Sequence, residues 1–302
     1  MKRAAVVGTG RLGTALAGAL VEAGYPLAGL ADADISAARR ARRLVRRGTA
    51  TDDPSRTADK ADLVFLCVPD AAIRPVAAAL ARSDVDWTGK IVFHASGLVP
   101  ASALGPLRAR GASTAAFHPI QSFPGRTQTA SSEPFRNIFV GLEGGRRAVA
   151  AGSEVARALG ARPLSLGGRD KSLYHAACSV ASNLLVPLFD LACEALVKAG
   201  FPPSRAGNIL LPLLEGTLQS VKRLNRPDAL TGPIARGDEE TVRRHLRALG
   251  RIPRAEAVYR LLARQALDLV ARKGIRPEAR KRIKALLEER RLPPRARART
   301  SP

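Results

Sequence analysis

The sequence predicts an α/β domain with a doubly wound, mostly parallel sheet, followed by an all-helical domain. Up to residue 168, short β-branched runs alternate with helical segments, as strands and their covering helices do in parallel sheets. From residue 169 to 292 the strand-like runs vanish and long helical periodicity takes over. These patterns place a domain boundary at residue 168 and leave residues 293–302 as a basic tail that we expect to be disordered.

The individual elements follow from the same patterns, taken in order. Short apolar runs predict strands at 4–7, 27–30, 63–68, 91–93, 114–117, 138–142 and 162–166. Helical periodicity predicts helices between them at 11–23, 35–47, 71–82, 101–110 and 146–159. One long helix over 169–199, kinked at Pro187, opens the second domain, and helices follow at 205–221, 239–249, 254–272 and 277–291. A loop over 230–237 leads to Asp238, which is expected to cap the helix after it.

The run Gly8-Thr9-Gly10-Arg11-Leu12-Gly13 joins the first strand to the first helix. In dinucleotide-binding domains of the Rossmann type, the first glycine makes a tight turn, the second admits a pyrophosphate and the third lets the helix pack on its strand. The phosphates then lie at the positive end of the helix. Because the spacing agrees with its strand-to-helix context, we predict that residues 1–168 bind a dinucleotide. A glycine-rich turn in another kind of parallel sheet is the alternative.

Asp32 follows the second predicted strand, about 20 residues after Gly13, where an acid hydrogen-bonds the ribose hydroxyls of NAD and repels a 2′-phosphate. The arginines at positions 39, 40, 42 and 43 could nevertheless receive that phosphate. The expected cofactor is therefore NAD or NADP, with NAD favoured. Val68 and Pro69 end the third strand and are expected to contact the cofactor, and Asp70 beside them either joins that contact or caps the next helix.

The amino-acid composition argues against some classes of binding partner. It carries 49 basic and 26 acidic residues, a formal net charge of +23, but few aromatic residues accompany the charge and no nucleic-acid motif appears, so nucleic acid is not an expected partner. Cys67, Cys178 and Cys193 show no metal-type spacing and an odd count, which fits a reducing cytoplasm. We find no signal peptide and no apolar run approaching the ~18 residues of a spanning helix, so no membrane partner is expected.

Three of the four histidines fall at positions that would line a cleft between the domains. His94 ends a strand just before Ser96, His118 ends another, and His175 lies early in the long helix. Ligands of such sheets bind beyond the carboxyl ends of the strands. Each histidine alone could only satisfy backbone groups, but the three together favour a site. No paired spacing or carboxylate cluster accompanies them, so no metal is expected.

The start of the long helix carries a polar stripe on an otherwise apolar sequence. His175 and Ser179 are four residues apart and share a face with Lys171 and, slightly turned, Asn183. Hydride transfer to a carbonyl or imine needs a proton donor, and histidine has a suitable pKa. We expect His175 to be the donor, with Lys171 as the second candidate and Ser96 and Asn183 orienting the substrate. Hydrogen bonding between helices of the second domain is the alternative.

Several motifs carry a resemblance to a known family. They are the glycine run, Val68-Pro69-Asp70, His94-x-Ser96-Gly97, His118-Pro119 with Ser122-Phe123, Tyr174-His175-Ala176-Ala177 with Ser182-Asn183, and Thr231-Gly232-Pro233 with Arg236-Gly237-Asp238. They resemble a bacterial family of Rossmann-like oxidoreductases whose second domain is similar to the C-terminal domain of 6-phosphogluconate dehydrogenase. The resemblance covers residues 3–270.

By this resemblance the relatives include pyrroline-5-carboxylate reductase, hydroxyisobutyrate dehydrogenase, deazaflavin-dependent NADP oxidoreductase and, more distantly, ketopantoate reductase. It implies NAD(P) binding, reduction of a small C=O or C=N group and homodimerisation through the helical domain. In the hydroxyacid relatives a lysine is followed four residues on by asparagine, whereas here Lys171 is followed by His175, so the proton donor stays open. Asp32-Ala33-Asp34 stands where a Ser-Arg-Ser run is common, so an NADP preference does not follow.

We therefore expect an NAD(P)-dependent oxidoreductase that acts on a small anionic substrate such as a 2-keto acid, with a ketopantoate-like acid as the first candidate. Arg236 would bind the substrate carboxylate through two parallel hydrogen bonds, unless it only stabilises its own loop. The alternative is a dinucleotide-sensing or regulatory protein that binds the cofactor without turnover.

Overall fold

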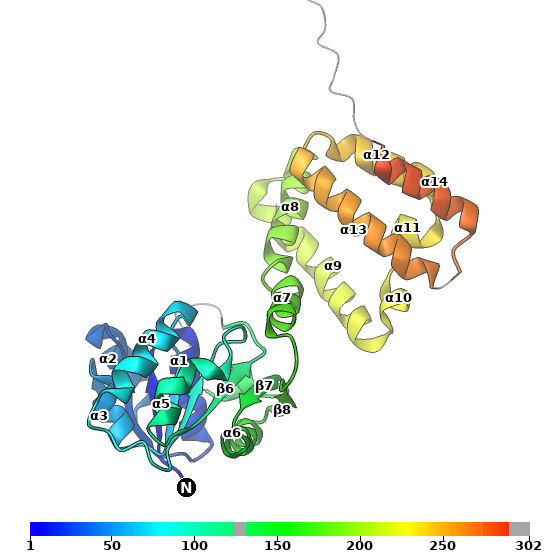
Figure 1. Cartoon of the computed structure of the whole chain (residues 1–302). Helices are drawn as coiled ribbons and strands as arrows, with labels where there is room; N and C mark the ends of the chain where they lie inside the picture. Colours follow the sequence, from blue (N-terminus) through cyan, green and yellow to red (C-terminus); the bar gives the residue numbers. More distant parts are fainter. Residues whose placement is uncertain (124–130, 273, 290–302) are drawn as a thin grey trace, which may run out of the picture. The chain divides into compact units, whose positions relative to one another are not determined.

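The structure, a computed structural model, describes residues 1–123, 131–272 and 274–289 of the chain. It forms two compact units, Met1–Asn183 and Leu184–Pro302 (Figure 1). The first unit thus runs past the boundary expected at residue 168 and includes the start of the helical part. The predicted disordered tail, 293–302, lies outside the described residues.

The first unit is built on an eight-stranded sheet in the order β3-β2-β1-β4-β5-β6-β7-β8. Its strands are β1 Ala4–Val7, β2 Leu27–Ala31, β3 Thr49–Thr51, β4 Leu63–Leu66, β5 Ile91–His94, β6 Ser113–Pro119, β7 Phe139–Gly144 and β8 Arg162–Ser165. All neighbouring strands pair in parallel except β6 and β7, which are antiparallel. The prediction of a doubly wound, mostly parallel sheet is confirmed.

Helices cover both faces of this sheet. They are α1 Arg11–Glu22, α2 Ile35–Val45, α3 Pro54–Asp59, α4 Asp70–Ala81, α5 Gly105–Ala109 and α6 Arg146–Ala158, with the 3₁₀ turns Ala101–Leu104 and Glu133–Phe135. The last helix of this unit is α7 Lys171–Ala181, which follows β8. Successive strand residues point to opposite faces, so Phe65, Phe93 and Phe117 pack with α1, α2 and α6, and Leu66 and Val92 pack with α3, α4 and α5. Figure 1 shows α6 beside β7 and β8.

Two elements of the first unit escape sequence reasoning because they are short. The three residues of β3 extend the sheet by pairing with β2. The six residues of α3 follow the N-cap residue Asp53, whose carboxylate accepts from the backbone N–H of Ser55. The helix predicted over 101–110 is a 3₁₀ turn followed by α5, since Pro106 in the first turn of α5 has no N–H to continue the preceding turn. Asp70 is the first residue of α4 and makes no capping bond.

The prediction of one kinked helix over 169–199 is wrong. Two helices form, α7 and α8 (Leu185–Lys198), and Ser182 between them leaves the helical conformation with φ −125° and ψ −72°. Pro187 has no N–H to bond the carbonyl of Asn183, one turn earlier, and its ring crowds that carbonyl. The proline therefore interrupts the helix upstream instead of bending it in place.

The second unit is helical in its described residues. Its helices are α8, α9 Pro203–Arg223, α10 Arg226–Ala229, α11 Gly232–Arg236, α12 Glu239–Leu249, α13 Pro253–Ala271 and α14 Pro277–Glu288. Val242, Leu267 and Ile283 belong to a core that joins α12, α13 and α14. Asp238 caps α12 as predicted, by accepting from the backbone N–H of Thr241. The predicted loop 230–237 instead contains α11, and Gly237, which follows the last residue of that helix, has a φ of +71°.

One helical stretch among the described residues, Lys171–Lys198, is long and apolar enough by length and composition to cross a membrane. The sequence reasoning did not expect such a stretch. None of its residues is fully buried, but the interruption at Ser182 divides it, and the side chains of Lys171 and Tyr174 bond to Glu143 and His118 in the sheet of the first unit. These features favour a role for its apolar side chains in contacts with protein.

Candidate functional site

The glycine run forms a strand-to-helix turn that tolerates no side chain at two positions. Gly8 has φ +91°, and a Cβ there would lie 2.5 Å from the carbonyl oxygen of Cys67, which follows β4. A Cβ on Gly13 would lie 1.9 Å from the carbonyl oxygen of Gly8. A Cβ on Gly10 would meet no described atom within 4 Å. The first and third glycines therefore build the turn, while the second faces open space.

The first turn of α1 is arranged to receive an anion. Gly10 is the N-cap residue of α1 and has no side chain that could cap the helix. The first backbone N–H groups of the helix can therefore donate to a ligand. Thr9 is tied to the end of β2, because its backbone N–H and hydroxyl both donate to Asp32 Oδ2, at 2.6 and 2.8 Å. These residues fit the pyrophosphate and ribose of a dinucleotide, the group predicted for this motif.

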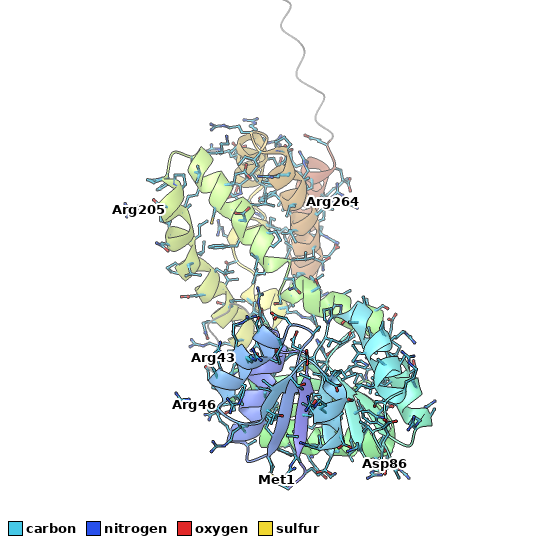
Figure 2. All side chains as sticks on the ribbon, turned by 90° about the vertical axis from the view of Figure 1, so that its left-hand side faces the viewer. Met1, Arg43, Arg46, Asp86, Arg205 and Arg264 are labelled. Atoms are coloured by element: carbon cyan, nitrogen blue, oxygen red, sulfur yellow. The ribbon has the colours of Figure 1, made fainter. Side chains whose placement is uncertain are left out.

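The arginines that could receive a 2′-phosphate lie on α2, which follows Asp32. They are exposed, and Figure 2 labels one of them, Arg43. Arg40 donates to Ser36 Oγ at 2.8 Å and to the carboxylate of Asp34 at 3.3 Å. Asp34 also caps α2 by accepting from the N–H of Ser36. Arg40 is thus engaged with an acid.

Strand register brings the predicted histidines onto one face of the sheet. His94 of β5 is paired with Ala116 of β6, and Ala116 with Glu143 of β7, so these three side chains point to the same face. His118, two residues after Ala116, lies on this face as well and opposes Gly141. The antiparallel β7 therefore adds a carboxylate and a glycine beside the two histidine-bearing strands.

Lys171, in the first turn of α7, is anchored to this face. Its Nζ donates to the carbonyl of Val99 at 2.6 Å and to Glu143 Oε2 at 3.2 Å. The same carboxylate oxygen accepts from the backbone N–H of Ala101 at 2.9 Å. The lysine side chain is only 10% exposed, so this ion pair is well shielded from solvent and binds α7 to β7 and to the segment after β5.

His118 and Tyr174 are directly bonded, with 2.7 Å between Nδ1 and the phenol oxygen. The ring of His175 lies 6.1 Å from that of His118, centroid to centroid. Burial lowers the pKa of His118 to about 4, and the charges of His175 and Lys171 act in the same direction. Burial also raises the pKa of Tyr174. Near neutral pH the bonded pair is therefore an uncharged imidazole and an uncharged phenol.

His94 and Ser96 lie beneath this surface. His94 is fully buried, its Nδ1 accepts from the backbone N–H of Ser96 at 3.3 Å, and its Nε2 has no hydrogen-bond partner among the described residues. Burial lowers its pKa to about 4. The Ser96 hydroxyl oxygen accepts from the N–H groups of Leu98 and Val99 and so shapes the turn after β5. This burial favours a supporting role for both residues.

The other predicted site residues are placed as follows. Val68 lies next to the glycine turn, since a Cβ on Gly8 would be 3.0 Å from its Cγ1, and Pro69 is the N-cap of α4. Ser179 is half-buried on α7, and Asn183 is exposed in the interruption after it. Arg236 is the last residue of α11 and belongs to the second unit.

The structure thus gathers a cluster of six side chains on one face of the sheet: His94, His118, Glu143, Lys171, Tyr174 and His175. Sequence reasoning missed two of its members, Tyr174 and Glu143. Tyr174 stands next to His175, but its helical position does not reveal a partner on β6. Glu143 is an acid at the end of an otherwise apolar predicted strand, which is a usable signal. Neither contact follows from the sequence, because both depend on the antiparallel pairing of β7.

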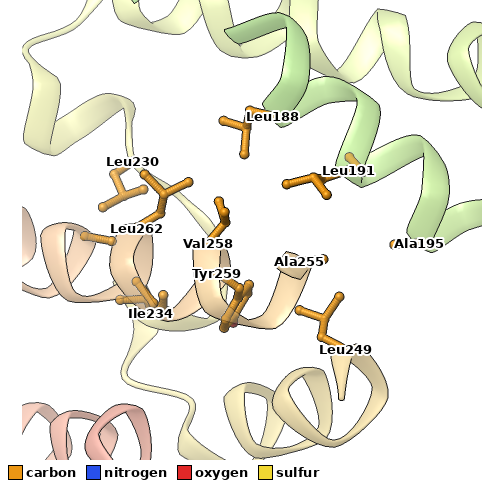
Figure 3. Close-up of a pocket in the computed structure, with 13 residues that line it drawn as sticks. Leu188, Leu191, Ala195, Leu230, Ile234, Leu249, Ala255, Val258, Tyr259 and Leu262 are labelled. Carbon is orange, nitrogen blue, oxygen red and sulfur yellow. The ribbon is translucent and has the colours of Figure 1, made fainter. Parts of the chain in front are cut away.

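A separate pocket of about 480 Å³ lies in the second unit, between α8 and α13. Figure 3 shows Leu188 and Leu191 of α8 facing Val258 and Leu262 of α13 across it. Tyr259 is a polar member of this otherwise apolar lining. Apart from the Tyr259 hydroxyl, the lining carries no acidic, basic or hydrogen-bond-donating side chain, so we assign the candidate active site to the first unit.

Comparison with known families finds two matches, and they divide the chain earlier than the two compact units do. Residues 2–119 match a model of Rossmann-like domains, and residues 138–266 match a domain of unknown function, DUF2520. The chain combines a Rossmann-like domain with a DUF2520 domain. The DUF2520 match begins just before β7, so Glu143, Lys171 and Tyr174 belong to it, whereas His94 and His118 belong to the Rossmann-like domain. The cluster is therefore assembled from both domains.

Solved structures show the same fold as this Rossmann-like and DUF2520 chain. BF3122 of Bacteroides fragilis, named as an NADP oxidoreductase, is 24% identical with a TM-score of 0.70, covering 88% of this chain and 97% of its own. The 1-pyrroline-5-carboxylate reductase of Streptococcus pyogenes is 13% identical with a TM-score of 0.60, and the match covers 88% of this chain and 98% of the reductase. An imine reductase of Pseudomonas sp. is 17% identical with a TM-score of 0.59, and the match covers 88% of this chain and 93% of that enzyme. The resemblance read from the motifs is confirmed. The comparison with curated proteins gives no significant match.

Proposed function

We propose that this protein is an NAD(P)-dependent oxidoreductase that transfers a hydride between the nicotinamide and a C=O or C=N group of a small substrate. The observation that carries the proposal is the uncapped N-terminus of α1 behind the glycine turn, with Thr9 bonded to Asp32 beside it. The names of the similar structures, an NADP oxidoreductase and reductases of pyrroline-5-carboxylate and imines, support it. The bound cofactor supplies the hydride, and the residues of the chain bind, orient and protonate the substrate.

NAD is the proposed preferred cofactor. The carboxylate of Asp32 stands at the end of β2, where it can accept from ribose hydroxyls and repel a 2′-phosphate. Arg40, which could offset this repulsion, already bonds to Asp34 and Ser36. These two observations favour NAD over NADP.

His175 is the proposed proton donor. Lys171, the other candidate, uses two of its three N–H donors on Val99 and Glu143, and transfer of its proton would weaken the contact that holds α7 to the sheet. His175 is half-buried beside His118, and histidine is the residue type that most often serves as a general acid or base. Asn183 is proposed to orient the substrate.

The proposed substrate is a small anionic 2-keto acid, with a ketopantoate-like acid as the first candidate, and the corresponding cyclic imines as the C=N class. The excess of basic residues favours an anion. Arg236 is proposed to bind the substrate carboxylate through a paired hydrogen bond, with Ser179 as a further contact.

We also propose a homodimer in the cytoplasm. The described part of the second unit exposes large apolar side chains on α8 and α9, including Val186, Leu213 and Val221, and it holds the apolar pocket between α8 and α13. Exposed apolar surface of this extent marks a protein contact. The three cysteines are free, which suits a reducing compartment.

The test is a fluorescence titration of the purified protein with NADH and NADPH, followed by a panel of 2-keto acids and cyclic imines with the cofactor that binds more tightly. Binding with substrate-dependent oxidation of that cofactor is the expected result. Binding without turnover over the whole panel would favour the sensing alternative, and binding of neither cofactor would refute the proposal.

A further inference from the structure

The hydrogen bond between His118 and Tyr174 joins the end of β6 to α7, two elements far apart in the sequence. Both side chains are partly buried, and the rings meet edge to face with centroids 5.6 Å apart. A Cβ on Gly141, which opposes His118 in the sheet, would lie 2.8 Å from the Tyr174 phenol oxygen. A Cβ on Gly97 would lie 2.7 Å from Cε1 of His118. Two glycines therefore make the room in which this pair meets.

The chemistry of the two groups decides which one donates. A phenol is a far stronger acid than a neutral imidazole N–H, and an imidazole nitrogen is a better acceptor than a phenol oxygen. The phenol should therefore donate to Nδ1, which leaves the imidazole proton on Nε2. Within the described residues, the only hydrogen bond that the side chain of His118 makes is the one to Tyr174. Its Nε2–H thus stays free to donate to a ligand.

We propose that Tyr174 is a positioning residue that locks His118 in the Nε2–H tautomer, and that this N–H donates to the oxygen or nitrogen of the substrate's C=O or C=N bond. This inference rests on the proposed function. A neutral histidine held in one tautomer polarises such a bond without giving up its proton. The hydride adds to carbon, the electron pair of the π bond moves to the oxygen or nitrogen, and His175, whose ring is 6.1 Å from that of His118, supplies the proton.

The test uses the ring nitrogens of uniformly ¹⁵N-labelled full-length protein, read by long-range ¹H–¹⁵N correlation at neutral pH. The sequence has only four histidines, so His118→Gln and His245→Gln variants assign the relevant signals. We expect His118 with a protonated Nε2 and an unprotonated Nδ1. In Tyr174→Phe, the ratio of the Nε2–H to the Nδ1–H tautomer should fall by at least about fivefold, the size of one lost hydrogen bond.

A second histidine–tyrosine pair supplies the matched control. His245 Nδ1 and the Tyr259 phenol oxygen are 3.1 Å apart in the second unit. Tyr259→Phe should change the His245 signals and leave those of His118 unchanged. An Nδ1–H tautomer of His118 in the wild type would overturn the proposal, and this measurement needs no variant to fold. An unchanged His118 tautomer in Tyr174→Phe would overturn it as well.

The assay separates this inference from the proposed function, because it requires neither cofactor nor turnover. Absence of NADH and NADPH binding would refute the function while the tautomer is still measured. Where the panel identifies a substrate, Tyr174→Phe should lower kcat about fivefold with an unchanged Kd for the cofactor. A change in cofactor Kd with an unchanged kcat would contradict the role given to Tyr174.

Discussion

The Asp32 carboxylate oxygen Oδ2 accepts from both the backbone N–H and the hydroxyl of Thr9, at 2.6 and 2.8 Å. This contact joins the glycine turn after β1 to the end of β2. A single acid thereby holds the turn in place and stands where the ribose of a dinucleotide would lie. Under the proposed function, one side chain therefore links the geometry of the turn to the choice between NAD and NADP.

Asp32→Ser should shift cofactor preference toward NADPH. The substitution removes a charge that repels a 2′-phosphate and weakens acceptance from ribose hydroxyls, so the Kd for NADH should rise about tenfold relative to that for NADPH. Titration of both cofactors measures the ratio. Asp86→Ser, at an exposed acid in the loop before β5 that leaves Asp32, Asp34 and Arg40 in place, is the control. An unchanged ratio in Asp32→Ser would contradict the role of this acid.

Substitutions at two glycines of the turn should have different effects: one should reduce cofactor affinity and the other should reduce stability. Gly10→Ala places a methyl group in open space, so the free energy of unfolding should fall by less than about 1 kcal/mol while cofactor affinity drops at least about tenfold. Gly13→Ala places a methyl group 1.9 Å from the Gly8 carbonyl oxygen and should lower Tm clearly. Denaturant unfolding and NADH titration of both variants test this contrast, which fails if Gly10→Ala binds NADH like the wild type.

His175→Ala should reduce turnover about 10²-fold with little change in cofactor Kd, because an acid–base group typically contributes that much. Lys171→Met removes the bonds to Val99 and Glu143, so it should lower Tm as well as the rate. Steady-state kinetics and thermal unfolding of the two variants distinguish the donor from the anchor. Full activity of His175→Ala would exclude it as the donor.

Lowering the pH should reduce the free energy of unfolding, and His94 should account for part of this loss. Its pKa is lowered from 6.5 to about 4 by burial, so between these pH values the unfolded chain binds a proton that the folded chain does not. Stability is thus retained above pH 6.5 and lost as the pH falls toward 4. From pH 7 to 4.5 the wild type should lose on the order of 2 kcal/mol more than His94→Gln. His245→Gln, at an exposed position, should follow the wild-type pH dependence in denaturant unfolding.

Leu213→Glu should convert the proposed dimer to a monomer. Leu213 is 69% exposed on α9, and a buried unpaired carboxylate in an apolar interface is strongly unfavourable. Leu44→Glu, at a 48% exposed leucine of α2, is the matched control and should leave the assembly unchanged. Light scattering coupled to size exclusion reports the mass of both, and a monomeric wild type would refute the dimer.

Local patterns account for most of the first unit. The glycine run predicted its turn because close approach between Gly8, Gly13 and the end of β4 excludes any Cβ. The strand β3 has three residues and the helix α3 has six, which is too few to show a periodic pattern of apolar residues, so neither was predicted. Pro187 indicated a disturbance of the helix, but the carbonyl it affects lies one turn earlier, so the helix ended before the expected kink.

The sequence by itself determined the dinucleotide turn, the acid after β2, the alternation of strands and helices, and the candidacy of His118 and His175, because each is a property of residues close together in the chain. Only the tertiary structure decided which of these residues meet. The antiparallel register of β7 places Gly141 beside His118 and Glu143 level with His94, and α7 then brings Tyr174 and Lys171 onto the same face. Such contacts depend on strand pairing across long sequence separations, which local periodicity does not encode.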